Sequence, residues 1–75
     1  VSVISNVVEG NSRESKKDKA HFIQLAYSSL MEVLCQLDIS VELGYLSRVK
    51  YEEMRVDIVK ISKMLSGLRK YYKGD

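Results

Sequence analysis

A heptad-spaced apolar stripe is the most regular pattern in the chain. Its members follow one another in alternating steps of three and four residues, and they are Tyr51, Met54, Ile58, Ile61, Leu65, Leu68 and Tyr72. This spacing is typical of a helix face that packs against another helix. Ser47 precedes the stripe, and serine favours the N-cap position of a helix. The pattern therefore predicts a helix over residues 47–73.

A second apolar stripe lies upstream and consists of Ile23, Ala26, Leu30, Leu34, Leu37 and Val41. Ser15 and Asp18 have the spacing of a capping box, in which the serine caps the first turn. Gly44 supplies the left-handed residue that often follows a helix. These signals predict a helix over residues 15–43. Because only residues 44–46 connect the two helices, we expect them to lie adjacent and antiparallel.

Residues 1–9 form a shorter and mostly apolar segment in front of these helices. We expect this segment to be the end of a helix that begins upstream. Gly10 is expected to stop that helix in a left-handed conformation, with a loop over residues 11–14. The chain has no proline and only four glycines, which favours long helices over sheet. The predicted fold class is all-α.

Several apolar residues fall outside both stripes. In helical projection they lie on the far sides of the two long helices, and they are Leu25, Ile39, Leu43, Val56 and Val59. One interpretation is that they are ordinary surface residues. We favour contact with further helices or with symmetric copies, because a hairpin alone would leave this apolar area in water. The candidate oligomer contacts are Leu25, Ile39, Val56 and Val59.

Length and composition exclude several classes of protein. The chain has 75 residues with one cysteine and one histidine, so it forms one small domain without an internal disulfide or a complete zinc site. No apolar run approaches the roughly 20 residues of a membrane span, and no segment has the pattern of a signal peptide. With a lone thiol, these features favour a cytoplasmic protein that has no membrane partner.

Candidate catalytic and metal-binding groups are sparse. His21 follows Asp18 by three residues, so both side chains can face one way, but a surface histidine is the simpler interpretation because no further ligands are assembled. Cys35 lies more than about three turns from His21, too far for a nucleophile pair. No glycine-rich phosphate loop or Ser-His-Asp order is present. The sequence therefore predicts no enzyme, no catalytic residues, no metal and no cofactor.

Positive charge is concentrated late in the chain. Residues 1–44 carry a net charge of −2 and residues 45–75 a net charge of +4. Every charged residue within 60–74 is basic, and these are Lys60, Lys63, Arg69, Lys70 and Lys73. We identify them as candidate contacts to nucleic-acid phosphates. The alternative is a solvated face, because basic residues in the last helical turns complement the helix dipole and maintain solubility.

A smaller basic group lies near the predicted start of the helix over residues 15–43. Its members are Arg13, Lys16 and Lys17. A helix N-terminus attracts anions through its free backbone amides. These residues are therefore a candidate secondary rim for anion binding.

Four short motifs, in order along the chain, carry a resemblance to a known family. They are Ser5-Asn6-Val7-Val8-Glu9-Gly10, then Ser15-Lys16-Lys17-Asp18 leading to Phe22, then Glu42-Leu43-Gly44-Tyr45-Leu46-Ser47 with Tyr51, and finally Ser62-Lys63-Met64-Leu65-Ser66-Gly67-Leu68. Together they resemble the later part of the four-helix-bundle proteins encoded in 23S rRNA intervening sequences. Two departures are Ile4, where the family usually has a proline, and the basic Arg48-Val49-Lys50 segment in place of an acidic helix start.

The resemblance implies an antiparallel up-down four-helix bundle. Residues 1–75 would then be the carboxyl-terminal portion of one domain, seen as a long helical hairpin plus the end of a preceding helix. Residues 1–9 would end the second helix of that bundle, residues 15–43 would form the third, and residues 47–73 the fourth. The family is similar to the accessory proteins of diversity-generating retroelements, which bind nucleic acid and a reverse transcriptase partner. It also implies a cyclic homo-oligomer, in particular a pentamer.

We therefore expect a non-catalytic, oligomeric accessory protein that binds RNA or DNA through basic surfaces repeated in the assembly. The alternative is a protein–protein interaction scaffold without nucleic-acid binding, in which apolar residues dock a protein partner. Fold alone does not decide between these functions.

Overall fold

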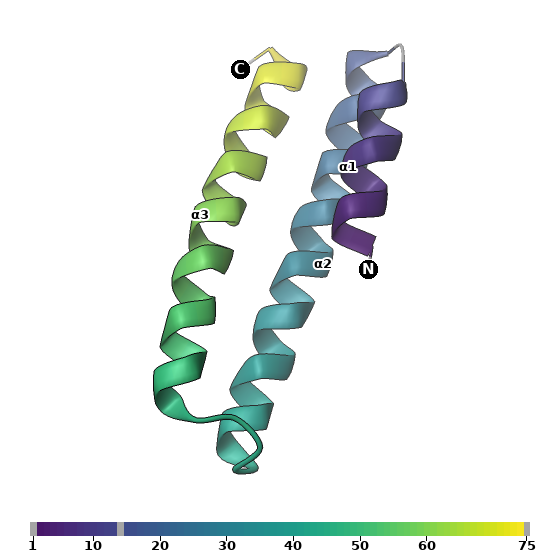
Figure 1. Cartoon of the computed structure of the whole chain (residues 1–75). Helices are drawn as coiled ribbons and strands as arrows, with labels where there is room; N and C mark the ends of the chain where they lie inside the picture. The colour runs from purple at the N-terminus through teal and green to yellow at the C-terminus, as the bar shows by residue number, and fades with distance from the viewer. Residues whose placement is uncertain (1, 14, 75) are drawn as a thin grey trace.

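Three helices make up the structure, a computed structural model that describes residues 2–13 and 15–74. Helix α1 spans Ser2–Ser12, α2 spans Lys16–Glu42 and α3 spans Arg48–Lys73, and no strand occurs within these described ranges. Helices α2 and α3 form a long antiparallel hairpin, and α1 lies against the amino-terminal half of α2 (Figure 1). The molecule measures 44 × 20 × 13 Å. The all-α prediction is confirmed, and Val1, which the predicted first helix included, lies outside the described residues.

Both predicted N-caps are present. The Ser15 hydroxyl accepts a hydrogen bond from the backbone amide of Asp18 at 3.4 Å, and the Ser47 hydroxyl accepts one from that of Lys50 at 3.2 Å. Each bond satisfies an amide that has no partner inside the helix. The two serines therefore fix where the long helices begin.

The turn between α2 and α3 follows from the predicted left-handed glycine. Gly44 has a φ of 80°, and its amide donates to the Val41 carbonyl at 3.1 Å. The Tyr45 amide donates to the Ser40 carbonyl at 2.9 Å. This pair of bonds is a Schellman motif, which satisfies the last carbonyls of α2 and reverses the chain.

Gly10 does not stop α1, so that prediction is wrong. Within the described residues, only Gly44 and Gly74 have positive φ, and α1 continues through Gly10 to Ser12. Gly10 is buried where α1 crosses α2, and a Cβ built on it would lie 3.1 Å from the Phe22 Cβ. The missing side chain therefore allows the two helices to approach each other closely, and it has no role in a turn.

The core lies between α2 and the two helices that pack on it. Its buried members are Ile23, Ala26 and Leu30 from α2 with Ile58 and Leu65 from α3, and Val3 and Val7 of α1 pack against them. The α3 stripe is buried only at every seventh residue, because Tyr51, Ile58 and Leu65 face α2. The intervening Met54 and Ile61 are each 40% exposed. The apolar stripe of α3 is thus wider than the surface that α2 covers.

Candidate nucleic-acid interface

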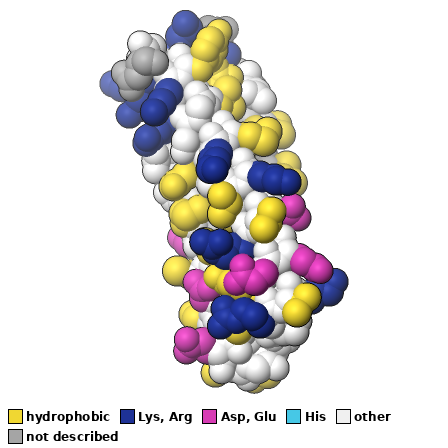
Figure 2. Space-filling model, turned by 90° about the vertical axis from the view of Figure 1, so that its left-hand side faces the viewer, with side chains coloured by type: hydrophobic (Ala, Val, Ile, Leu, Met, Phe, Trp, Pro, Cys, Tyr) yellow, Lys and Arg dark blue, Asp and Glu magenta, His cyan; other side chains and the backbone are white. Residues whose placement is uncertain are grey.

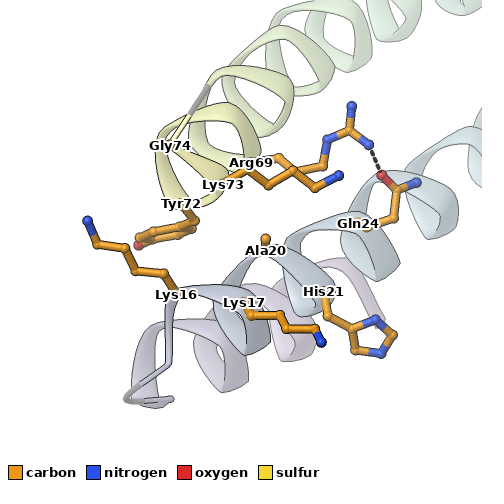
Figure 3. Close-up of a pocket in the computed structure, with 9 residues that line it drawn as sticks. All are labelled: Lys16, Lys17, Ala20, His21, Gln24, Arg69, Tyr72, Lys73 and Gly74. Atoms are coloured by element: carbon orange, nitrogen blue, oxygen red, sulfur yellow. Dashed lines mark hydrogen bonds between the residues drawn. The ribbon is translucent and has the colours of Figure 1, made fainter.

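An open hollow lies at the end of the molecule where α2 begins and α3 ends. Its volume is about 740 Å³. One wall comes from α2 and the other from the end of α3 (Figure 3), and the lining residues are Lys16, Lys17, Ala20, His21, Gln24, Arg69, Tyr72, Lys73 and Gly74. Among the described residues, the lining contains four permanent cations and no carboxylate. We call this surface the basic end.

The antiparallel hairpin creates the hollow. It places the first two turns of α2 beside the last turns of α3, and Ala20 occupies the buried position between them. A methyl group fills little of the space between two helices, so the site stays open above Ala20. The Arg69 guanidinium crosses from α3 and donates a hydrogen bond to the side-chain oxygen of Gln24 on α2. This bond holds one cation of the site in a fixed position.

Two tyrosine rings contact lysine side chains at the same end. The Lys16 ammonium lies 5.6 Å from the centre of the Tyr71 ring, and the Lys19 ammonium lies 5.4 Å from that of Tyr72. Tyr72 is half-buried against the core, which confirms its place in the apolar stripe, and its hydroxyl is 3.4 Å from the Asn11 side-chain oxygen. Tyr71 is exposed, as expected. The ring faces orient these lysines without neutralising them.

Within residues 2–13 and 15–74, most of the charge at the basic end has no ion-pair partner. In the described part of the chain, ion pairs join Arg13 to Glu9, Arg48 to Glu52 and Lys50 to Glu53. Of these, only the Arg13 pair, at 2.6 Å, lies near the basic end. Asp18 stands in the first turn of α2 but does not line the hollow. A concentration of unpaired cations of this kind attracts polyanions.

The structure brings together two groups that the sequence showed as separate. Lys16 and Lys17 form the α2 wall, and Arg69 and Lys73 line the hollow from α3. The third member of the predicted rim, Arg13, is engaged elsewhere, with its guanidinium 4.7 Å from the centre of the Phe22 ring.

The remaining basic candidates lie along the side of α3. Lys63 and Lys70 line a shallower depression together with Ser62, Ser66 and Tyr27, and Lys60 is exposed and lines neither hollow. On the face shown in Figure 2, basic side chains gather toward the upper end, whereas the acidic ones lie lower. Basic side chains therefore also occur along the side of α3, outside the basic end.

A second hollow, between α1 and α3, is apolar. Its volume is about 730 Å³, and its lining includes Val3, Ile4, Val7 and Val8 from α1 with Ile61, Met64, Leu68 and Tyr71 from α3. The backbones of α1 and α3 both lie against α2 and not against each other, and the side chains of α1 and α3 leave this groove open between them. The groove explains why Ile61 stays exposed although it belongs to the apolar stripe.

A family model described as 23S rRNA-intervening sequence protein matches residues 1–67. The chain belongs to this family. The family resemblance noted from the four motifs is thereby confirmed. Searches among curated proteins and among solved structures gave no match. The α3 wall of the basic end, from Arg69 onward, lies beyond the matched residues.

In this 23S rRNA-intervening sequence protein, the predicted oligomer contacts are only partly exposed to solvent. Ile39 is 57% and Val56 50% exposed, and Leu25 is also exposed, whereas Val59 is half-buried. At the first family departure, Ile4 lies on the continuous helix α1. At the second, Arg48 and Lys50 are neutralised by Glu52 and Glu53 within the same helix.

The sequence did not single out Ala20 or Gln24, and His21 was considered as a surface histidine or a metal ligand and not as part of a hollow. The signal for a shared α2 wall was present, because positions 16, 20 and 24 recur every four residues on one helix face. The α3 wall depends on how α3 is aligned along α2. The spacing of residues within a single helix does not show this alignment.

His21 and Cys35 have no chemical partner of the kind that catalysis or metal binding requires. The His21 ring packs edge-on against the Phe22 ring, with 5.7 Å between the ring centres. Cys35 is exposed. Among the described residues, no three His, Cys, Asp or Glu side chains gather where a metal ion could bind. Within the same residues, no helix is both long and apolar enough to cross a membrane.

Proposed function

We propose that this protein is a non-catalytic accessory protein that binds RNA or DNA through its basic end. The observation that carries the proposal is that cations from the start of α2 and the end of α3 line one hollow, and that among the described residues none of these lining cations has an ion-pair partner and no carboxylate lines the hollow. Phosphate contacts by lysine and arginine supply most of the sequence-independent affinity for nucleic acid.

We also propose a homo-oligomer, built from antiparallel four-helix bundles, that presents several basic ends at once. The open apolar groove between α1 and α3 supports a fourth helix at this position, since such a helix would cover the exposed apolar side chains. Ile39 and Val56, exposed on the outer faces, support contacts between copies. A cyclic pentamer remains the arrangement that the family resemblance implies. Repetition would convert a weak single site into useful affinity.

The second candidate function is a protein interaction scaffold, and the same apolar groove favours it. A groove of this kind can accept the apolar face of an amphipathic helix from a protein partner. In that case the basic end would serve only for solubility, and removal of its charges would leave partner binding unchanged.

Binding to fluorescent RNA and DNA oligonucleotides over a salt series tests the first function. We expect affinity to fall with salt and the log–log slope to drop by about one for each phosphate-contacting lysine removed. The test variant replaces Lys16, Lys17 and Lys73 with Gln. Its matched control replaces Arg48, Lys50 and Arg55, which removes the same charge from the opposite end of α3. Equal loss in both variants, or no binding at low salt with oligomers intact, would contradict the proposal.

A further inference from the structure

We infer that the hollow of the basic end binds an oligophosphate group, that is, several linked phosphates such as those of a triphosphorylated RNA end. The inference rests on the proposed nucleic-acid binding and specifies which part of the nucleic acid enters the hollow. It would place the chain terminus, with its extra phosphates, between α2 and α3. The internal phosphodiesters would then contact only the surrounding surface.

The charge of the hollow favours linked phosphates over a single phosphodiester. Its four permanent cations, Lys16, Lys17, Arg69 and Lys73, line the same hollow, and no carboxylate among the described residues lines it. A phosphodiester brings a single negative charge, which would leave most of these cations uncompensated. A terminal phosphate alone carries about −1.5 to −2 at neutral pH, and linked phosphates add further charge within a few ångströms. An oligophosphate therefore matches the local charge density better.

The shape of the hollow supports the same ligand. Its volume of about 740 Å³ lies within the range of roughly 300–1,000 Å³ that is typical of small-ligand sites. Figure 3 shows Arg69 and Lys73 extending from α3 above Ala20, with Lys17 and His21 on the α2 side. The small Ala20 leaves the room that a phosphate chain needs. The hollow also lies at one end of a molecule that is 44 Å long. It does not form a stripe along the side of the molecule.

Arg69 is prepared to bind a phosphate oxygen. Gln24 accepts one hydrogen bond from its guanidinium, and a guanidinium has five N–H donors in total. The remaining donors keep a fixed direction without using up the charge, since the Gln24 amide is neutral. Arginine held in this way forms paired hydrogen bonds with phosphate at a low entropic cost.

The inference is tested with three RNAs of one sequence that carry a 5′-triphosphate, a 5′-monophosphate or a 5′-hydroxyl, each titrated with the full chain. We expect the triphosphorylated RNA to bind at least about tenfold more tightly than the hydroxyl form, because charge-assisted hydrogen bonds are gained. Lys73→Gln and Arg69→Gln should remove most of this preference. Ala20→Leu, which fills the hollow and keeps every charge, should remove it too. The control Arg55→Gln, at an exposed position outside the hollow, should retain it.

Free tripolyphosphate distinguishes the source of the ligand. Competition by tripolyphosphate alone, with an affinity equal to that of the triphosphorylated RNA, would identify a free oligophosphate as the ligand. Tighter binding of the RNA would identify the nucleic-acid end. Equal, salt-dependent affinity for all three RNAs, without competition by tripolyphosphate, would overturn the inference and leave the proposed function standing. If no RNA binds but tripolyphosphate does, the proposed function fails and the oligophosphate site remains.

Discussion

At the scale of single residues, two glycines inside helices have opposite surroundings although the sequence presents them alike. Gly10 is buried against Phe22 and the Lys19 carbonyl of α2, whereas no atom of a neighbouring element lies within 4 Å of a Cβ built on Gly67 in α3. The first glycine permits a close helix crossing. The second only adds backbone flexibility to an exposed helix.

Gly10→Ala should destabilise the fold, and Gly67→Ala should stabilise it. A Cβ at Gly10 would lie 3.1 Å from the Phe22 Cβ, so α1 must shift, and such overpacking costs about 1–3 kcal/mol against a helix-propensity gain of about 1 kcal/mol. At Gly67 only the gain of about 1 kcal/mol applies. Urea unfolding followed by circular dichroism measures both free energies. A Gly10→Ala protein more stable than the parent would show that the close crossing is unimportant.

Tyr51 makes the stability of the hairpin depend on pH. The interaction of its hydroxyl with the Asp38 carboxylate, together with burial, raises the pKa of Tyr51 above its usual value of 10.0. The neutral form is therefore favoured in the folded state. The resulting stability is fully present below about pH 10, and it is lost as the pH rises through the raised folded-state pKa.

Tyr51→Phe should accordingly make unfolding less sensitive to alkaline pH. We expect the free energy of unfolding to fall less steeply between about pH 9 and pH 11 in this variant than in the parent, since the titrating hydroxyl is gone. Tyr71→Phe, at an exposed position, serves as the control and should follow the parent. Parallel curves for the parent and Tyr51→Phe would contradict the role of the Asp38 contact. Urea titrations at each pH provide the measurement.

At the scale of elements, the hairpin turn determines which charged residues lie together at the basic end as well as the topology. The Schellman motif at Gly44 reverses the chain so that the carboxyl end of α3 returns to the amino end of α2. A turn with another geometry would separate Lys16 and Lys17 from Arg69 and Lys73. The basic end is therefore a product of the turn and of two helices of similar length.

Gly44→Ala should weaken the turn, because a residue with a Cβ pays about 1–2 kcal/mol in the left-handed conformation that Gly44 adopts with φ of 80°. Gly44→Asn should lose less, since asparagine tolerates this conformation better than alanine. Thermal unfolding of both variants measures the difference. A side chain at position 44 would meet no steric clash, because no atom of a neighbouring element lies within 4 Å of a Cβ built there. Only the backbone conformation therefore disfavours alanine. Equal stability of the two variants would contradict a conformational origin.

At the scale of the whole molecule, the three described helices leave apolar surface on several sides. The groove between α1 and α3 faces one side, and Ile39 and Val56 are exposed on the outer faces of the hairpin. A chain of 75 residues buries only roughly 60% of the surface of its unfolded state, so further contacts would add substantially to its stability. Assembly into an oligomer would therefore raise the stability of the fold and also increase the number of basic ends that are presented together.

The double substitution of Ile39 and Val56 by Glu should lower the mass in solution. Buried charges at a contact between copies are strongly unfavourable, whereas the helices themselves should remain because both side chains are already at least half exposed. Light scattering gives the mass relative to the 8.6 kDa chain, and circular dichroism reports the helix content. The control places Glu at Ser28 and Gln36, two exposed polar positions of α2. An unchanged mass would exclude Ile39 and Val56 as contacts.

The sequence by itself determined the helices, because their signals are local. Ser15, Ser47 and Gly44 act on backbone groups within a few residues, and the apolar stripes report which side of each helix is buried. Gly10 was misjudged because its role depends on Phe22 of another helix and not on its own turn.

Only the tertiary structure decided which charges share a site and which apolar positions stay exposed. Arg69 and Gln24 are 45 positions apart, and their contact depends on the register of α3 beside α2. Ile61 has the spacing of a core residue, yet it lines the open groove between α1 and α3 and stays 40% exposed. Periodicity defines a face of a helix, but the partner of that face is set by packing between elements distant in the chain.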